Sequence, residues 1–177
     1  MFIPGQIIAA VTFPGIIVHE AAHKFFCDIS KVPVYEVSYF NFSKTPGYVV
    51  HGPLNDLKSS FLIAAGPLII NSALCMVLTA PASISLIFLG SGPGNNPPAV
   101  YFILMWLGLS IGMHAFPSPQ DAANFKEHTK QSKANIFIKL FAWVFVIIIT
   151  IAHALRVIWF DLFYALALSS VALRILL

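Results

Sequence analysis

The sequence IIAAVTFPGIIVHEAAH, residues 7–23, runs from an apolar segment directly into the pattern His-Glu-x-x-His. On a helix, His19 and His23 lie one turn, about 6 Å, apart on the same face. That separation suits two imidazoles that bind one Zn²⁺ at about 2.0–2.1 Å. Glu20 follows the first histidine, so its carboxylate can reach a water on the metal without being a ligand. The pattern therefore predicts one zinc per chain with a general base beside it.

The plainer alternative is that these are polar residues at a helix end that faces solvent. Residues 7–18 are almost wholly apolar, which places the pattern inside or at the edge of a membrane-length segment. A charged residue within the bilayer costs about 2.5–3.5 kcal/mol, and such residues usually line a functional interior. The apolar surroundings therefore favour the metal site.

The composition indicates an integral membrane protein. Hydrophobic residues make up 58% of the chain and charged residues 10%, whereas soluble domains carry about 25% charged residues. No basic segment with a small-residue cleavage site precedes the first apolar segment, so we expect that segment to remain in the mature protein. Cys27 and Cys75 lack CxxC spacing and are expected to be small core residues without a disulfide. At this length, a single domain over residues 1–177 is expected.

The order of apolar blocks predicts an all-α polytopic membrane protein with four to five transmembrane helices. The blocks cover about residues 2–26, 60–89, 99–116 and 134–177. The helix that carries the histidines is expected to begin near Pro14. As one helix, residues 134–177 would be about 65 Å long, twice the hydrocarbon thickness, so this block must bend, tilt along the interface or form a hairpin. Arg156 and Asp161 mark the expected turn. C-terminal helices are expected over residues 134–177.

A β-hairpin is predicted between the first two blocks. Residues 34–42 and 47–51 are rich in β-branched and aromatic residues, and a Ser-Lys-Thr-Pro turn signal separates them. Two strands are not stable alone in water, so the hairpin is expected to pack on the bundle or the membrane surface.

The distribution of lysines predicts the orientation. The loop after the first block contains Lys24, Lys31, Lys44 and Lys58, and the loop after the third contains Lys126, Lys130 and Lys133. The loop at residues 90–98 contains no Lys or Arg. The positive-inside rule therefore makes the first and third loops cytoplasmic, so Asp121 and the histidines can meet near the cytoplasmic side. The same reasoning puts Asp161 on the opposite side.

Asp121 is the best placed acidic residue for a third ligand, because it follows the interruption Pro117-Ser118-Pro119 at the end of a helix. Catalytic zinc usually has three protein ligands and an open position. Asp is also a preferred N-cap, and Asp121 stands in front of the polar stretch 122–130. Ligand and cap both remain possible roles.

Three segments in order resemble the site-2 protease family of intramembrane zinc metalloproteases. They are HEAAH at 19–23, Ala-Gly-Pro-Leu-Ile-Ile-Asn at 65–71, and Phe-Pro-Ser-Pro-Gln-Asp at 116–121. The resemblance implies that His19, His23 and Asp121 bind zinc and that Glu20 activates the water. It also implies that about residues 7–121 form a three-helix catalytic core and that the hairpin corresponds to the family's membrane-associated sheet.

The chain departs from the family beside the third segment. Met113 stands where the family commonly has Asn, and His114 follows it. His114 could polarise or position the scissile carbonyl, could replace Asp121 as a ligand, or could be a buried histidine bonded to backbone. In the second segment, Gly66-Pro67 is expected to allow a kink and close helix packing, and Asn71 is expected to hydrogen-bond another helix.

These observations together predict an intramembrane zinc-dependent endopeptidase that cleaves transmembrane segments of membrane proteins. Its expected partners are such a substrate and the lipid bilayer, with no nucleic acid. The alternative is a catalytically silent zinc-binding membrane protein of the same fold that binds or scaffolds membrane partners. A transporter or channel is disfavoured, because the chain shows no repeated halves.

Overall fold

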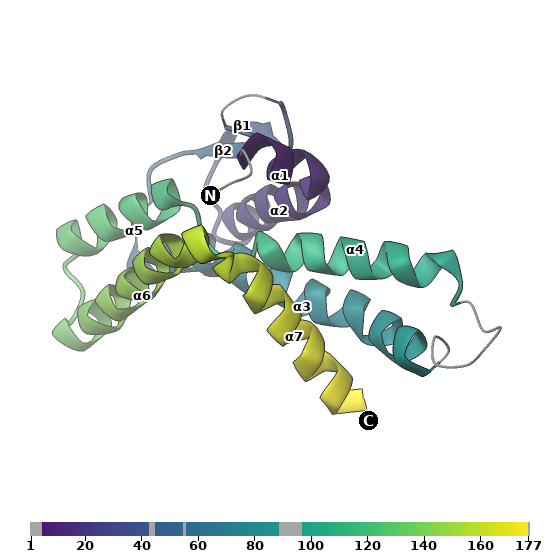
Figure 1. Ribbon diagram of the computed structural model, residues 1–177. Helices are drawn as coiled ribbons and strands as arrows, with labels where there is room; N and C mark the ends of the chain where they lie inside the picture. Colours follow the sequence, from purple (N-terminus) through teal and green to yellow (C-terminus); the bar gives the residue numbers. More distant parts are fainter. Residues whose placement is uncertain (1–4, 43–44, 55, 89–96, 177) are drawn as a thin grey trace.

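A computed structural model describes residues 5–42, 45–54, 56–88 and 97–176 of the protein (Figure 1). The chain is mostly helical with one small sheet. In order, its elements are α1 (Gly5–Val11), α2 (Phe13–Ile29), β1 (Val34–Ser38), β2 (Tyr48–His51), α3 (Leu57–Phe88), α4 (Ala99–Met113), α5 (Pro119–Gln131), α6 (Ile136–Leu155), the 3₁₀ turn η1 (Arg156–Ile158) and α7 (Phe160–Leu176). Residues 43–44 of the expected turn and 89–96 of the expected loop lie outside the described residues.

The first apolar block is broken between α1 and α2, which meet at an angle of 83°. Pro14 lies in the first turn of α2, as predicted, where its missing N–H costs no helical hydrogen bond. At the break, the N–H of Gly15 donates to the carbonyl of Thr12 at 3.1 Å, and a side chain of α4 bonds to both groups. Ser110 Oγ donates to the carbonyl of Thr12 at 2.9 Å and accepts from the N–H of Gly15 at 3.1 Å. α4 therefore fixes where α2 begins.

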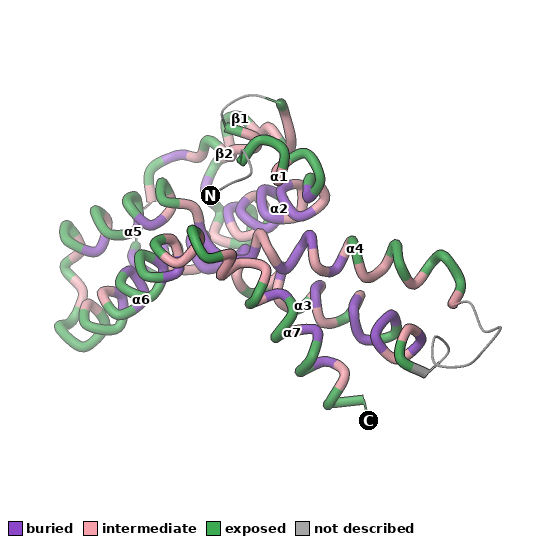
Figure 2. Tube along the Cα trace, in the orientation of Figure 1, coloured by how far each residue is buried: buried purple, intermediate pink, exposed green. Residues whose placement is uncertain are grey.

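Helices α3, α4 and α7 pack together, and α2 packs across α3 and α4. The buried positions lie where these helices meet (Figure 2). Gly66 lets α2 and α3 approach closely, because a Cβ there would lie 2.3 Å from the ring of Phe26. The side chain of Asn71, on α3, reaches the backbone of both neighbours at Gly15 and Ile111. The expected close packing at Gly66 and the expected interhelical bond of Asn71 are confirmed; the expected kink at Gly66-Pro67 stays a prediction, and Pro67 lies inside the continuous helix α3.

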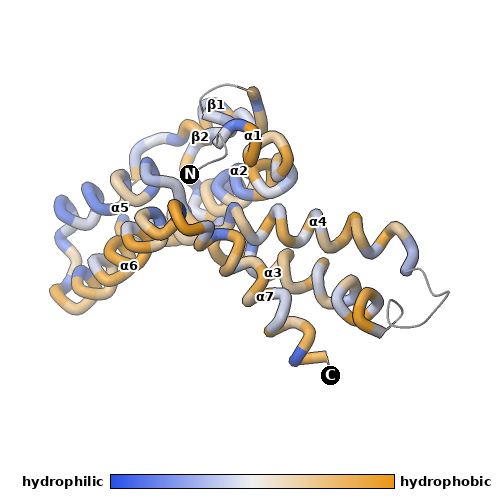
Figure 3. Tube along the Cα trace, in the orientation of Figure 1, coloured by the Kyte–Doolittle hydropathy of each residue, from blue (hydrophilic) through white to orange (hydrophobic). Residues whose placement is uncertain are grey.

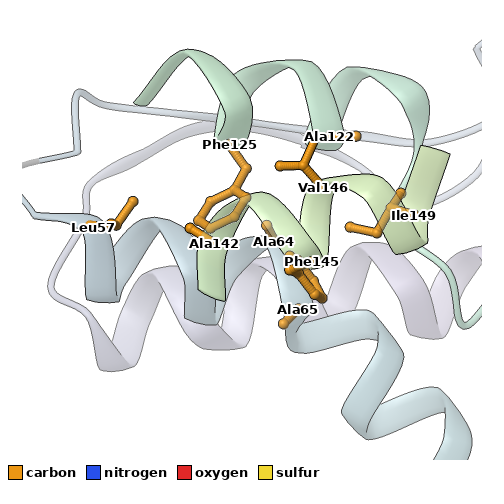
Figure 4. Packing of buried hydrophobic residues seen from close by; sticks show 9 residues of the cluster. All are labelled: Leu57, Ala64, Ala65, Ala122, Phe125, Ala142, Phe145, Val146 and Ile149. Atoms are coloured by element: carbon orange, nitrogen blue, oxygen red, sulfur yellow. The ribbon is translucent and has the colours of Figure 1, made fainter. Parts of the chain in front are cut away.

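Helices α5 and α6 run side by side and pack on the first turns of α3 (Figure 4). The contact is a cluster of buried apolar residues from these three helices: Leu57, Ala64, Ala65, Ala122, Phe125, Ala142, Phe145, Val146 and Ile149. Phe125 and Ile149 are each 1% exposed. This cluster anchors α5, and with it Asp121, against the helix that contacts α2.

The predicted hairpin is present as an antiparallel pair, with Val37 opposite Val49 and an irregularity between Val34 and Glu36. It packs on α2. Cys27 and Cys75 are free and fully buried, as expected.

Two helices are long and apolar enough to cross a membrane, α3 and the segment from α6 to η1. The bent pair α1–α2 brings the number to three, and α4, with 15 residues, is shorter than a span. The described residues therefore contain two or three candidate spans, fewer than the four to five expected. The predicted break in the last block is confirmed, because α6 ends at Leu155 and Trp159 takes a left-handed conformation, φ 63°, before α7.

Candidate metal centre

His19 and His23 lie on one buried face of α2, as the spacing predicted. Their side chains are 10% and 7% exposed, and their Nε2 atoms are 3.1 Å apart. Asp121 Oδ2 lies 3.3 Å from Nε2 of His23 and 3.9 Å from Nε2 of His19. Among the described residues, these three form the group that could hold a metal ion.

Backbone carbonyls fix the tautomer of both histidines. Nδ1 of His19 is 2.7 Å from the carbonyl oxygen of His114, and Nδ1 of His23 is 2.9 Å from that of Ile63. A carbonyl can only accept, so each Nδ1 must carry the proton and donate it. In a neutral imidazole the Nε2 atom then has a free lone pair. Such hydrogen bonds to the second ring nitrogen are how proteins orient metal-binding histidines.

Asp121 reaches the histidines from the first turn of α5, across the Pro117-Ser118-Pro119 interruption. The N-cap of α5 is Ser118, whose side chain accepts from the N–H of Asp121 at 3.1 Å. Asp121 Oδ2 in turn accepts from the N–H of Ser118 at 2.7 Å, which completes a capping box. The alternative that Asp121 is itself the N-cap is therefore wrong, because the N-cap lies three residues earlier, at Ser118. Its carboxylate takes part in the cap and faces the histidines at the same time.

The convergence of these atoms fits a small cation. With both imidazoles neutral, two Nε2 lone pairs and a carboxylate oxygen face one another, and none of the three atoms offers a proton. Ligands at about 2.0–2.1 Å on a tetrahedral ion lie about 3.3–3.4 Å apart. The observed separations of 3.1, 3.3 and 3.9 Å are close to that value.

Glu20 lies on the same cavity as the three ligand atoms and is 8% exposed. The cavity has a volume of about 650 Å³ and is bounded by α1, α2, β2, the segment between α4 and α5, and η1. Gly47, at the start of β2, packs directly on Glu20. A Cβ at Gly47 would lie 2.7 Å from Cγ and 2.9 Å from Oε1 of Glu20. The hairpin thus covers the carboxylate that the sequence assigns as the base.

The chain was compared with protein-family models, curated proteins and solved structures. None of them matches. The function of this centre is therefore inferred from its own geometry and chemistry.

His114 lies beside the centre, but its ring is not among the three grouped ligands. Its Nε2 is 2.8 Å from the hydroxyl of Thr12, and that hydroxyl donates its proton to the carbonyl of Ile8 at 2.7 Å. The Nε2 of His114 must therefore be the donor to Thr12. The carbonyl of His114 accepts from His19 and, at 3.0 Å, from Asn71. His114 thus orients His19 through its backbone carbonyl, and it is one of the residues that line the cavity.

Several residues of this region were not foreseen from the sequence. Thr12 is a lone polar residue in an apolar segment, which was a usable signal. Gly47 carried none, because its importance comes from a neighbour 27 positions away in the chain. Arg156 and Asp161, which the sequence marks as a turn, both line the same cavity as His19. Asp161 thus shares a cavity with Asp121, although the loop charges predict that the two lie on opposite sides of the membrane.

Proposed function

We propose that the protein is an intramembrane zinc-dependent endopeptidase. The observation that supports this best is the meeting of two tautomer-fixed histidines and Asp121 next to Glu20, on a cavity inside an apolar helical body. Two imidazoles with one carboxylate are the ligand set of several zinc peptidases and leave a fourth position open. The resemblance of residues 19–23, 65–71 and 116–121 to the site-2 protease family supports the same reaction.

Zinc held by these residues would lower the pKa of a bound water toward about 7 and polarise a substrate carbonyl. Glu20 is placed to take a proton from the attacking water and to deliver it to the departing amine. The His114 and Ile63 carbonyls keep His19 and His23 in the tautomer that the metal requires. Gly47 holds Glu20 from the hairpin side, so the base cannot turn freely in the cavity.

A transmembrane substrate must unwind before cleavage, because its helical hydrogen bonds occupy the carbonyls. β2 lines the cavity through Tyr48, Val49 and His51, and β1 pairs with one of its two edges. We propose that the other edge of β2 accepts an extended peptide as an added strand. We propose that the substrate class is the transmembrane segments of membrane proteins, and that the lysine-containing loops 24–58 and 117–133 are cytoplasmic.

The deciding experiment combines zinc analysis with cleavage of a model transmembrane peptide by purified protein. Glu20→Gln should keep zinc but lose at least about 100-fold in rate, because general acid–base catalysis contributes about 10²–10⁴-fold. Glu127→Gln is the matched control, since Glu127 is exposed on α5 and pairs with Lys130. A Glu20→Gln variant that cuts near the wild-type rate would refute this role. Zinc binding without any cleavage by wild type would favour the catalytically silent alternative.

A further inference from the structure

Helices α5 and α6 form an arm, residues 119–155, that leaves the metal centre and returns to it. Asp121 lies at its start, and Arg156 follows its end; both residues line the same cavity. Nε2 of His153, near the end of α6, donates to the carbonyl of Pro117 at 2.6 Å. The two ends of the arm therefore lie at the same depth. α6, with 20 residues, is part of a segment long enough to span a bilayer, yet the 13-residue α5 runs beside it in the opposite direction (Figure 1).

The two helices of the arm expose opposite chemistry (Figure 3). α6 presents a stripe of large apolar side chains, each 47–63% exposed except Phe137 at 77%: Phe137, Leu140, Phe141, Val144, Ile147, Ile148 and Ile151. They recur every three to four residues and so share one face of the helix. α5 exposes polar side chains, namely Gln120, Asn124, Lys126, Glu127, Lys130 and Gln131. Each helix uses its remaining face for the cluster shared with α3.

A transmembrane position for α6 would carry α5 into the hydrocarbon beside it. Lys126, Glu127 and Lys130 would then be exposed to lipid at about 2.5–3.5 kcal/mol each near the centre. The opposite placement, with the arm standing in water, would expose the whole apolar stripe of α6. Exposed apolar patches larger than a few hundred Å² are rare on soluble surfaces. Neither placement satisfies both helices.

We infer that the arm lies in the plane of the membrane at its interface and binds an anionic lipid surface. The apolar stripe of α6 enters the acyl region, and the lysines of α5 face the headgroups, as in interfacial amphipathic helices. Trp143 marks the boundary, because its ring lies 6.0 Å from Nζ of Lys126, and tryptophan prefers the headgroup level.

The charge of the arm explains the choice of anionic lipid. The arm contains four lysines but one exposed acid, Glu127, because Asp121 is directed to the metal centre. The lysines are Lys126, Lys130, Lys133 and Lys139. Each lysine near an anionic surface contributes about 1 kcal/mol. This placement also accounts for Asp161 on the cavity, because a chain that does not cross at α6 begins α7 on the same side as Asp121.

Depth measurement with spin labels tests the placement independently of any enzymatic activity. Single cysteines at Phe137, Val144 and Ile151 sample the α6 stripe at intervals of seven residues. A spanning helix would separate successive labels by about 10 Å along the membrane normal. The accessibility of each label to oxygen and to a nickel chelate reports its depth. We expect the same shallow depth for all three labels. Cysteines at Ile69 and Val77, exposed on the candidate span α3, should differ in depth and serve as the control.

Two outcomes of this measurement would overturn the inference. A depth gradient along α6 equal to that along α3 would make α6 a span, and full nickel accessibility at all three α6 positions would place the arm in water. Wild type treated with the same spin label is the control for background labelling of Cys27 and Cys75, which are fully buried. Cysteines at Gln131 and Val157 give a second readout. Both should react with an impermeant maleimide from the same side, and labelling from opposite sides would contradict the in-plane arm.

The choice of anionic lipid is tested with bimane on a cysteine at Gln131, in bilayers containing brominated phosphatidylglycerol or brominated phosphatidylcholine at equal fraction. Quenching should be stronger by phosphatidylglycerol, and the difference should disappear at high salt and in Lys126→Gln/Lys130→Gln/Lys133→Gln. Arg174→Gln, at the far end of α7, is the control and should leave the difference unchanged. Equal quenching by both lipids in the unmutated arm would refute anionic selectivity.

Discussion

Gly47 lies so close to Glu20 that a single methyl group at Gly47 would overlap the carboxylate, with 2.9 Å between the added Cβ and Oε1. The contact joins the hairpin to α2, the helix of His19 and His23. Because the overlapping atoms belong to a side chain, an added methyl would displace Glu20 or lift the hairpin from it.

Gly47→Ala should therefore lower cleavage while zinc stays bound. A displacement of about 1 Å at a reacting group can reduce the rate about 100-fold. The measurement is kcat on a model transmembrane peptide together with zinc content. Gly5→Ala is the matched control, because a Cβ at Gly5 meets no atom within 4 Å. Wild-type kcat in Gly47→Ala would show that the contact does not hold the base.

The double role of Asp121 can be separated from the cap of α5. Asp121→Asn keeps a side-chain acceptor for the Ser118 N–H but is a poorer zinc ligand, so zinc affinity should fall strongly with little change in Tm. Ser118→Ala removes the cap and should cost about 1 kcal/mol of stability while zinc remains bound. Chelator competition and thermal unfolding measure the two effects. Full zinc affinity in Asp121→Asn would exclude Asp121 as a ligand.

His114→Ala should retain zinc and lower the rate. Its ring is bonded to Thr12, whereas the carbonyl that orients His19 belongs to the backbone and survives the substitution. Thr12→Val removes the hydroxyl that bonds to the His114 ring but leaves the ring itself in the protein. This variant should reproduce part of the loss in kcat. Zinc content and the pH profile of kcat/KM check both variants. Metal loss in His114→Ala, with full zinc affinity in Asp121→Asn, would reverse the assignment of the third ligand.

Strand pairing at β2 predicts a two-residue alternation in the effect of proline. Successive N–H groups of a strand point to opposite edges, so one alternate set in β2 points to β1 and the other points to the edge proposed for the substrate. Proline removes one donor at a time. Proline at one of Tyr48 and Val49 should destabilise the hairpin, and proline at the other should reduce only cleavage. Proline at Val37, on β1, is the third variant.

Unfolding temperature and cleavage of a transmembrane peptide, measured together, separate these effects. Unchanged cleavage in all three variants with the fold intact would count against pairing of the substrate on β2.

The sequence by itself determined the features that depend on neighbouring residues. The i, i+4 spacing of His19 and His23 follows from helix geometry, so it required only that the segment be helical. The breaks near Pro14 and at Arg156 were predictable, because proline and charge interrupt apolar helices locally. The β-hairpin was equally predictable from its composition and its turn signal. These signals are short-range, and a single chain carries them without knowledge of the fold.

Only the tertiary structure decided how the centre is completed. The carbonyls that set the histidine tautomers come from positions 95 and 40 residues away, and any residue offers a carbonyl, so no sequence pattern marks them. The packing of Gly47 on Glu20 likewise depends on where the hairpin folds back. The hydropathy of α6 is that of a membrane span, and the loop charges therefore predict that Asp161 lies on the side of the membrane opposite Asp121. The polar helix packed along α6 argues against a span there, because burial of an apolar helix depends on its neighbours and not on its own composition.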